Sequence, residues 1–165
     1  MSSERVSHEF PPVFDENSKV LILGSIPSPK SREQGFYYMH PQNRFWKMLC
    51  NVLGEDIPAD TDGRRKLCLS HGIALWDVLE SCDISGASDS SIKNAVPNDL
   101  DRIFRTADIR AVFTTGKTAH KLYQRFFEGN GHEAVCLPST SPANRTITEE
   151  AMLTEYRRIG EYLNK

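Results

Sequence analysis

The chain has 165 residues, of which 25% are charged and 39% hydrophobic, and its formal net charge is −2. A chain of this length and composition can fold as one globular domain without disulfides or metal ions. No apolar run approaches the roughly 18 residues of a membrane span, and the N-terminus lacks the hydrophobic segment of a secretion signal. We therefore expect a cytoplasmic protein with no membrane partner.

The four cysteines, Cys50, Cys68, Cys82 and Cys136, stand far apart and form no CxxC pair. This spacing argues against a zinc ribbon, and the apolar neighbours of Cys50, Cys68 and Cys136 favour buried free thiols. An iron–sulfur cluster assembled from four distant cysteines is the alternative, but nothing else in the sequence asks for one. We expect no metal, no iron–sulfur cluster and no other cofactor.

The expected elements alternate between strands and helices along the chain. Residues 1–18 are expected to form a polar arm, residues 19–24 a buried strand ending in glycine, and residues 25–41 a long loop with three prolines. Further on, apolar periodicity and turn residues predict helices over 41–53 and 61–70, then a strand over 73–76 with Asp77 as a possible cap after it. A polar loop is expected over 85–97, followed by a helix from its cap Asn98 to Arg105. The last expected elements are a strand over 111–115, a helix over 117–127, a strand over 133–137 and a helix over 148–163.

This alternation predicts an α/β fold, namely a three-layer α/β/α sandwich around a four-stranded, mostly parallel sheet. We expect one domain over residues 1–165, because the sequence shows no internal repeat and no linker. In such sheets, ligands bind beyond the carboxyl ends of the strands. The loops at 25–41, 114–117 and 138–145 each follow a strand, so we expect them to converge there and to carry the chemistry.

The loop after the first buried strand holds the richest set of candidate residues. Gly24 lets the backbone approach a ligand, and nearby backbone N–H groups can bind the polar edge of a base. Tyr38 either stacks on a base, which we favour, or packs in the core, which we favour for Phe36. Asn43, expected in the first turn of the next helix, either makes local hydrogen bonds only or takes part in catalysis. His40 is an acid–base candidate or a structural residue.

The loop over 137–145 has the sequence LPSTSPANR. Its hydroxyl groups can hold phosphates, and a stiff proline-containing loop can wedge into a base stack; a plain turn is the alternative. Two basic groups are candidates for phosphate contacts or are ordinary solvated faces: Lys30, Arg32, Arg44 and Lys47, and Lys117, His120, Lys121 and Arg125. Glycine-rich nucleotide-binding motifs, a GxSxG elbow and an HExxH motif do not occur.

Together, the two loops resemble the two motifs of the uracil-DNA glycosylase superfamily. Gly24-Ser-Ile-Pro-Ser28 matches motif one, and Leu137-Pro-Ser-Thr-Ser-Pro142 matches motif two, whose loop enters the minor groove. The segment over 24–46 resembles, without a gap, that of the mismatch-specific uracil/thymine glycosylases, and residues 72–78 and 88–92 are also similar to that group. The resemblance therefore covers most of residues 20–145.

Departures from these motifs narrow the resemblance to one branch. Ile26 stands where the mismatch-specific enzymes carry a catalytic Asn, and an isoleucine cannot orient water. Leu137 stands where motif two often opens with His or Asn, and Thr115 where relatives often have an Asn that contacts the base. The hypoxanthine-DNA glycosylase branch shares the pattern at Ile26 and Leu137 and assigns catalysis to the Asn of a PxN segment, which is Asn43 here.

The resemblance implies a monofunctional DNA glycosylase of base excision repair that hydrolyses the N-glycosidic bond of a flipped-out hypoxanthine and leaves an abasic site. Its partner is DNA with a deaminated base, and we expect a monomer. Asn43 would orient the water or bind the departing base. The pocket would be lined by Gly24, Ser25, Ile26, Tyr38 and Thr115, and DNA would be contacted by Ser28, Lys30, Lys117, Ser139, Thr140, Ser141, Pro142, Asn144 and Arg145.

Two alternatives to this function stay open. One is a glycosylase that prefers uracil or mismatched bases. The other is a damaged-DNA binder that kept the fold and lost the chemistry together with the motif-one carboxamide.

Overall fold

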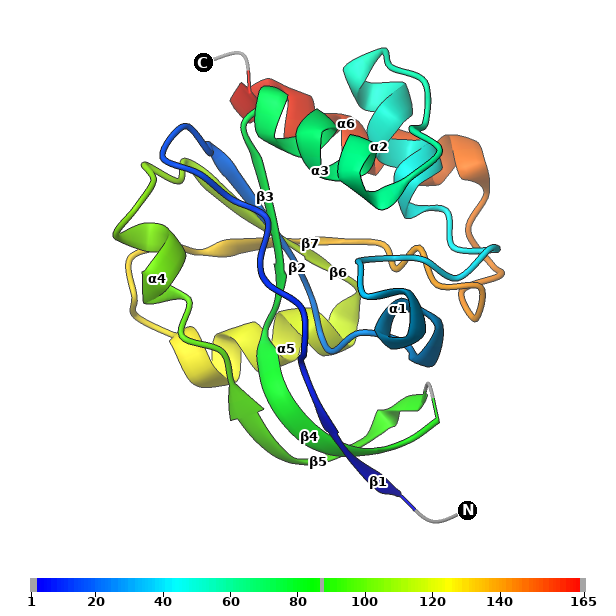
Figure 1. Ribbon diagram of the computed structural model, residues 1–165, viewed down its shortest axis with the longest axis vertical. Helices are drawn as coiled ribbons and strands as arrows, with labels where there is room; N and C mark the ends of the chain where they lie inside the picture. Colours follow the sequence, from blue (N-terminus) through cyan, green and yellow to red (C-terminus); the bar gives the residue numbers. More distant parts are fainter. Residues whose placement is uncertain (1–2, 87, 164–165) are drawn as a thin grey trace.

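A computed structural model describes residues 3–86 and 88–163 and places a four-stranded parallel sheet at the centre of the molecule (Figure 1). The strand order is β3-β2-β6-β7. All residues of β2 and β3 are buried, because helices cover both faces of the sheet. The four strands are β2 (Val20–Gly24), β3 (Ile73–Asp77), β6 (Ala111–Thr115) and β7 (Ala134–Leu137), so the predicted sheet is confirmed.

The helices form the two outer layers of the predicted sandwich (Figure 1). One layer contains α2 (Phe45–Leu53), α3 (Thr61–Ser70) and α6 (Glu149–Leu163). The other side of the sheet is covered by α4 (Asp101–Phe104) and α5 (Lys117–Phe127). No helix among the described residues is both long enough and apolar enough to cross a bilayer.

A second, antiparallel sheet with the order β1-β4-β5 corrects two of the predictions. The expected polar arm contains β1 (Glu4–Ser7), and the expected polar loop over 85–97 contains all of β5 (Ser88–Pro97), which pairs with β4 (Leu79–Ser85). Most of β5 is exposed, so it shows no apolar run that the sequence pattern could reveal. The pairing of its backbone with β4 defines this strand.

The helices in the first part of the chain also differ from the predictions. The helix expected from Pro41 begins at Phe45, and a short helix, α1 (Pro29–Gln34), interrupts the expected loop over 25–41. Ser28 caps α1, since its Oγ accepts a hydrogen bond from the Ser31 backbone N–H.

Asn98 does not cap a helix, because the residue before α4 is Leu100. Its buried side chain instead donates Nδ2 hydrogen bonds to the carbonyls of Asp77 (2.9 Å) and Leu79 (3.0 Å). Asp77 likewise ends β3 rather than capping a helix. Asn98 therefore fixes the path of the chain from β3 into β4.

We predict that Asn98→Ala lowers the free energy of unfolding by about 2 kcal/mol, because it leaves two buried carbonyl groups without their donor. Urea unfolding followed by circular dichroism measures the change. Asn51→Ala, at an exposed position of α2, is the matched control and should change stability by no more than about 0.5 kcal/mol. Equal effects at the two positions would contradict the role assigned to Asn98.

Candidate active site

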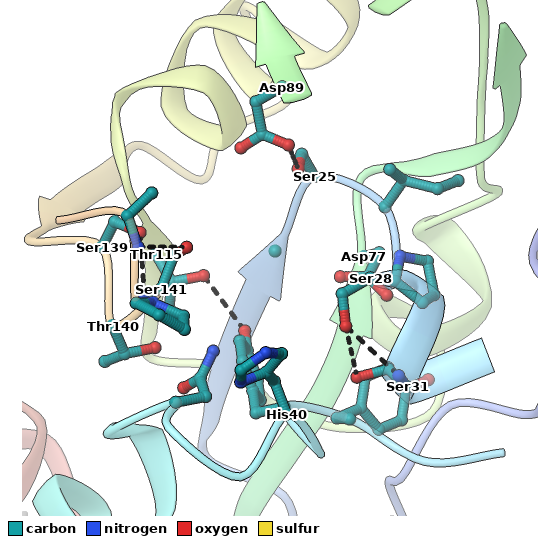
Figure 2. Close-up of a pocket in the computed structure, with 18 of the residues that line it drawn as sticks. Ser25, Ser28, Ser31, His40, Asp77, Asp89, Thr115, Ser139, Thr140 and Ser141 are labelled. Carbon is teal, nitrogen blue, oxygen red and sulfur yellow. Dashed lines mark hydrogen bonds between the residues drawn. The ribbon is translucent and has the colours of Figure 1, made fainter. Parts of the chain in front are cut away.

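A pocket of about 300 Å³ opens at the carboxyl edge of the parallel sheet, where the chemistry is expected (Figure 2). Gly24 pairs with Asp77 in the strand register, and Thr115 ends the strand on the other side of β2. The predicted convergence of the loops that follow β2, β6 and β7 is therefore observed. The sequence-predicted residues that line the pocket are Gly24, Ser25, Ile26, Ser28, Tyr38, His40, Asn43, Thr115, Ser139, Thr140, Ser141 and Pro142.

Gly24 keeps space open at the floor of this pocket. A Cβ atom at this position would lie 2.5 Å from Asp77 Oδ1, 3.4 Å from Tyr38 Oη and 3.6 Å from Thr115 Oγ1. Any side chain would therefore collide with the Asp77 carboxyl group. Glycine is required here so that three polar atoms from different elements can approach one another.

Asn43 lies half-buried in the turn before α2 rather than in its first turn. Its Oδ1 accepts a 2.9 Å hydrogen bond from the Phe45 backbone N–H, and its own backbone N–H donates to the His40 carbonyl at 2.9 Å. Because an N–H donor needs an oxygen acceptor, this contact fixes the orientation of the amide. Oδ1 holds the start of the helix, and Nδ2 is the group that can donate to a ligand in the pocket.

Tyr38 forms part of the pocket wall. Its backbone is in the left-handed region (φ 57°), which is rare for a bulky residue and is typical of functional loops. Its ring stacks on Phe45 with 3.8 Å between ring centroids. Burial is the largest cause that raises the pKa of Tyr38 well above its usual value, so the phenol stays neutral. Phe36, by contrast, is 1% exposed and belongs to the core, as predicted.

Thr115 positions Tyr38 through its hydroxyl group. Thr115 Oγ1 lies 3.3 Å from the Leu23 carbonyl oxygen and 3.1 Å from Tyr38 Oη. Between the Tyr38 and Thr115 hydroxyls either oxygen can be the donor, and in both cases the Thr115 hydrogen points to a protein acceptor, the Leu23 carbonyl or Tyr38 Oη. The Thr115 hydroxyl hydrogen is thus committed within the protein.

β3 ends in a buried carboxyl group, that of Asp77, which the sequence analysis did not place in the site. Asp77 Oδ2 lies 2.8 Å from His8 Nε2, and the two side chains are only 5% and 2% exposed. The His8 ring lies against Phe10, with 4.5 Å between the centroids. The expected N-terminal arm therefore supplies a partner to the pocket floor. A polar residue at the end of a buried strand was the signal that could have identified Asp77.

A second carboxyl group, that of Asp89, reaches the pocket from β5. Ser25 Oγ donates a 3.2 Å hydrogen bond to Asp89 Oδ1 (Figure 2). Asp89 is exposed as a residue, but its carboxyl group lines the pocket, and partial desolvation there raises its pKa; the Ser25 hydrogen bond opposes this rise, and the charge of Asp77 adds to it. Sequence reasoning missed Asp89 because the hairpin that carries it was expected to be a loop.

The loop over 138–145 is stiffened by its own hydrogen bonds. Ser139 Oγ accepts from the Ser141 backbone N–H (3.2 Å), and Asn144 Nδ2 donates to the Ser139 carbonyl (2.9 Å). The Arg44 guanidinium donates to the Asn144 carbonyl at 2.6 Å and so joins this loop to the start of α2. The serine hydroxyl hydrogens stay available to donate to phosphate oxygens.

The other predicted DNA contacts differ in their exposure and in their distance from the pocket. Thr140 lines the pocket but is only 2% exposed, which favours a structural role over a phosphate contact. Ser28 has a capping role in addition to its place on the pocket wall. Lys30 lies outside this wall, 3.5 Å from Glu33, whereas Lys117 and Arg145 are exposed.

The first basic group expected from the sequence does not form a patch of free cations. Arg32 donates to the Pro27 carbonyl at 2.9 Å, and Lys47 lies 2.8 Å from Glu149. Together with Arg44, these residues hold parts of the protein to one another. Arg32 and Arg44 therefore have structural roles, whereas phosphate contacts by Lys30 and Lys47 stay a prediction.

The cysteines are free, with Cys50, Cys68 and Cys82 buried and Cys136 partly buried. Burial raises the pKa of the Cys68 thiol, as expected of an unreactive core residue. Within residues 3–86 and 88–163, no three His, Cys, Asp or Glu side chains are arranged to hold a metal ion.

Comparisons with known proteins identify the family of this chain. The model of the Uracil DNA glycosylase superfamily matches residues 11–161. A hypoxanthine DNA glycosylase of Methanosarcina acetivorans is 34% identical over 146 residues, which are 87% of this chain and 92% of that protein. A hypoxanthine DNA glycosylase of Methanosarcina barkeri is 36% identical over 138 residues, which are 82% of this chain and 87% of that protein.

A solved structure has the same fold. It is a solution NMR structure from Methanosarcina acetivorans, provisionally assigned as a uracil DNA glycosylase, with a TM-score of 0.82 and 32% identity. The match covers 94% of this chain and 97% of that one. Family model, relatives and fold all agree, and the chain belongs to the uracil DNA glycosylase superfamily.

Proposed function

We propose that this protein is a monofunctional DNA glycosylase that hydrolyses the N-glycosidic bond of deoxyinosine and releases hypoxanthine. The observation that carries the proposal is the orientation of Asn43, whose Nδ2 is free to donate into a pocket at the strand ends. The two Methanosarcina relatives named as hypoxanthine DNA glycosylases support the choice of base.

The pocket chemistry suits a base that leaves easily once it is flipped out of the helix. A deaminated base carries a ring amide that spreads the negative charge developing as the glycosidic bond breaks. Asn43 Nδ2 donates a hydrogen bond to the departing base, and this interaction strengthens as the charge grows. A neutral amide therefore lowers the barrier even though the apolar Ile26 occupies the motif-one catalytic position.

Tyr38 and the loop over 138–145 position the substrate. Phe45 covers one face of the Tyr38 ring, so the flipped base stacks on the remaining surface of Tyr38. The Ser139 and Ser141 hydroxyls donate to the phosphates beside the lesion. Pro142 and Asn144 fill or line the gap that the flipped base leaves, and the exposed Arg145 beside them contacts a phosphate.

A preference for uracil is the weaker alternative. The Thr115 hydroxyl hydrogen is already donated to an acceptor within the protein, so Thr115 does not replace the Asn that contacts the base in relatives. A non-catalytic binder would bind damaged DNA without releasing any base. The three possibilities therefore differ in the free base that appears: mainly hypoxanthine for the proposal, mainly uracil for the first alternative and none for the binder.

We predict that Asn43→Asp lowers the single-turnover rate of hypoxanthine release by about 100-fold or more, the effect of removing one donor to a developing anion. The aspartate retains an oxygen for the Phe45 N–H, so the start of α2 is preserved while the Nδ2 donor is lost. Release is measured on an oligonucleotide with one deoxyinosine.

Asn43→Ala removes both the donor and the oxygen and should be at least as slow, with a lower melting temperature. Both variants should still bind abasic-site DNA. Nearly wild-type release by Asn43→Asp would show that Nδ2 is not the catalytic group.

We further predict that Arg145→Ala weakens binding to abasic-site DNA and reduces the salt slope of log K by about 1, because one phosphate contact is lost. Fluorescence anisotropy at several salt concentrations measures this slope. Lys66→Ala, which removes an exposed cation on α3, is the control and should leave the slope unchanged. If both variants behave alike, Arg145 makes no specific phosphate contact.

A further inference from the structure

The pocket contains two carboxyl groups in different surroundings, and only one of them faces a histidine at hydrogen-bonding distance. We propose that Asp89 is a catalytic acid that donates a proton to N7 of the departing purine. This inference rests on the proposed function, because it assigns a second catalytic group to the same pocket.

Geometry places Asp89 where it can reach a base. The β4–β5 hairpin folds back so that Asp89 lines the same pocket as Asn43 and Tyr38. In the view of Figure 2, Asp89 and Ser25 lie across the pocket from His40. The Ser25 hydroxyl donates to Oδ1, which leaves Oδ2 to carry a proton toward a ligand.

The two carboxyl groups have different hydrogen-bond partners and surroundings. Asp77 Oδ2 has His8 Nε2 as a close partner at 2.8 Å. Partial desolvation in the pocket raises the pKa of Asp89, the Ser25 hydrogen bond lowers it, and the Asp77 charge raises it further. A raised pKa in a carboxyl group that lines a pocket is what a general acid requires.

Other titratable groups share the space around Asp89. The pocket is also lined by Asp77, Tyr37, Tyr38 and His40. Asp89 also lines an adjoining groove, together with Lys117, Cys136 and Glu155. Burial also keeps both tyrosines neutral by raising their pKa values, so the charges next to Asp89 come from the acidic and basic side chains.

The proposed step is a balanced hydrolysis. The bond between C1′ and N9 breaks, and its electron pair leaves with the base. The proton on Asp89 moves to N7, so hypoxanthine departs as a neutral molecule. A water oxygen forms a bond to C1′, and the proton released from that water returns to the Asp89 carboxylate. The enzyme is restored and one water is consumed.

A proton on N7 is useful only to a purine. Hypoxanthine has N7 in its five-membered ring, whereas uracil has no such ring and leaves as an anion that its two carbonyl groups stabilise. The role of Asp89 is therefore specific to the purine, while Asn43 serves either base. This difference separates the two proposed groups experimentally.

The test combines Asp89→Asn with a substrate that lacks the accepting atom, 7-deaza-2′-deoxyinosine. Asparagine retains an oxygen for the Ser25 hydroxyl but has no acidic proton. With deoxyinosine, the variant should release the base about 100-fold more slowly, in the range of general acid catalysis. With the 7-deaza substrate, the wild type should already be slow, and Asp89→Asn should change the rate by less than about threefold.

The pH profile gives an independent measurement. Asp89 acts in its protonated form, so the wild-type rate should fall as pH rises through its elevated pKa. This fall should disappear in Asp89→Asn. Asp77→Asn removes the charge that raises the Asp89 pKa and should move the fall to lower pH. Asp99→Asn, at an exposed position outside the pocket, should leave the profile unchanged.

Equal losses on both substrates would overturn the acid role, as would a pH dependence that persists in Asp89→Asn and disappears in His40→Gln. Hypoxanthine release by the wild type with no effect of Asp89→Asn would overturn this inference and leave the proposed function intact. If the wild type releases no hypoxanthine, both are wrong.

Discussion

The site depends on the pairing of two parallel strands, which sets Gly24 of β2 directly beside Asp77 of β3. A Cβ atom at residue 24 would lie 2.5 Å from Asp77 Oδ1, so a side chain at residue 24 would displace the Asp77 carboxyl group. The space that glycine leaves is bounded by Asp77, Tyr38 and Thr115. The strand register and the absence of a side chain at Gly24 therefore create the floor of the pocket.

The loops around this floor are held by hydrogen bonds that also determine what each side chain can do. Phe45 fixes the Asn43 oxygen, which makes the amide a donor toward the pocket. Thr115 is committed to Leu23 and Tyr38, which makes it a support for the ring and not a group for contacting a base. Arg44, one of the candidate phosphate contacts in the sequence, instead holds the 138–145 loop to the start of α2. In each case a hydrogen bond within the protein determines which donor or acceptor atom is left for a ligand.

Much of the central fold could be predicted because its cause is local. The apolar runs of β2 and β3 follow from burial on both faces, and the edge at which the loops meet follows from parallel strands. The second sheet could not be predicted in this way, because β5 is largely exposed and is defined by its pairing with β4. His8 and Asp89 were missed for the same reason: Asp89 reaches the pocket from this sheet, and His8, which follows β1, contacts Asp77 at the pocket wall.

The central claim is that this pocket releases hypoxanthine, and the most direct measurement is a panel of single-turnover assays on matched oligonucleotides. These differ only in one nucleotide, which is deoxyinosine, deoxyuridine or deoxyadenosine. We expect free hypoxanthine to form fastest, uracil to form more slowly and adenine not to be released. Faster release of uracil than of hypoxanthine, or tight binding without release of any base, would contradict this claim.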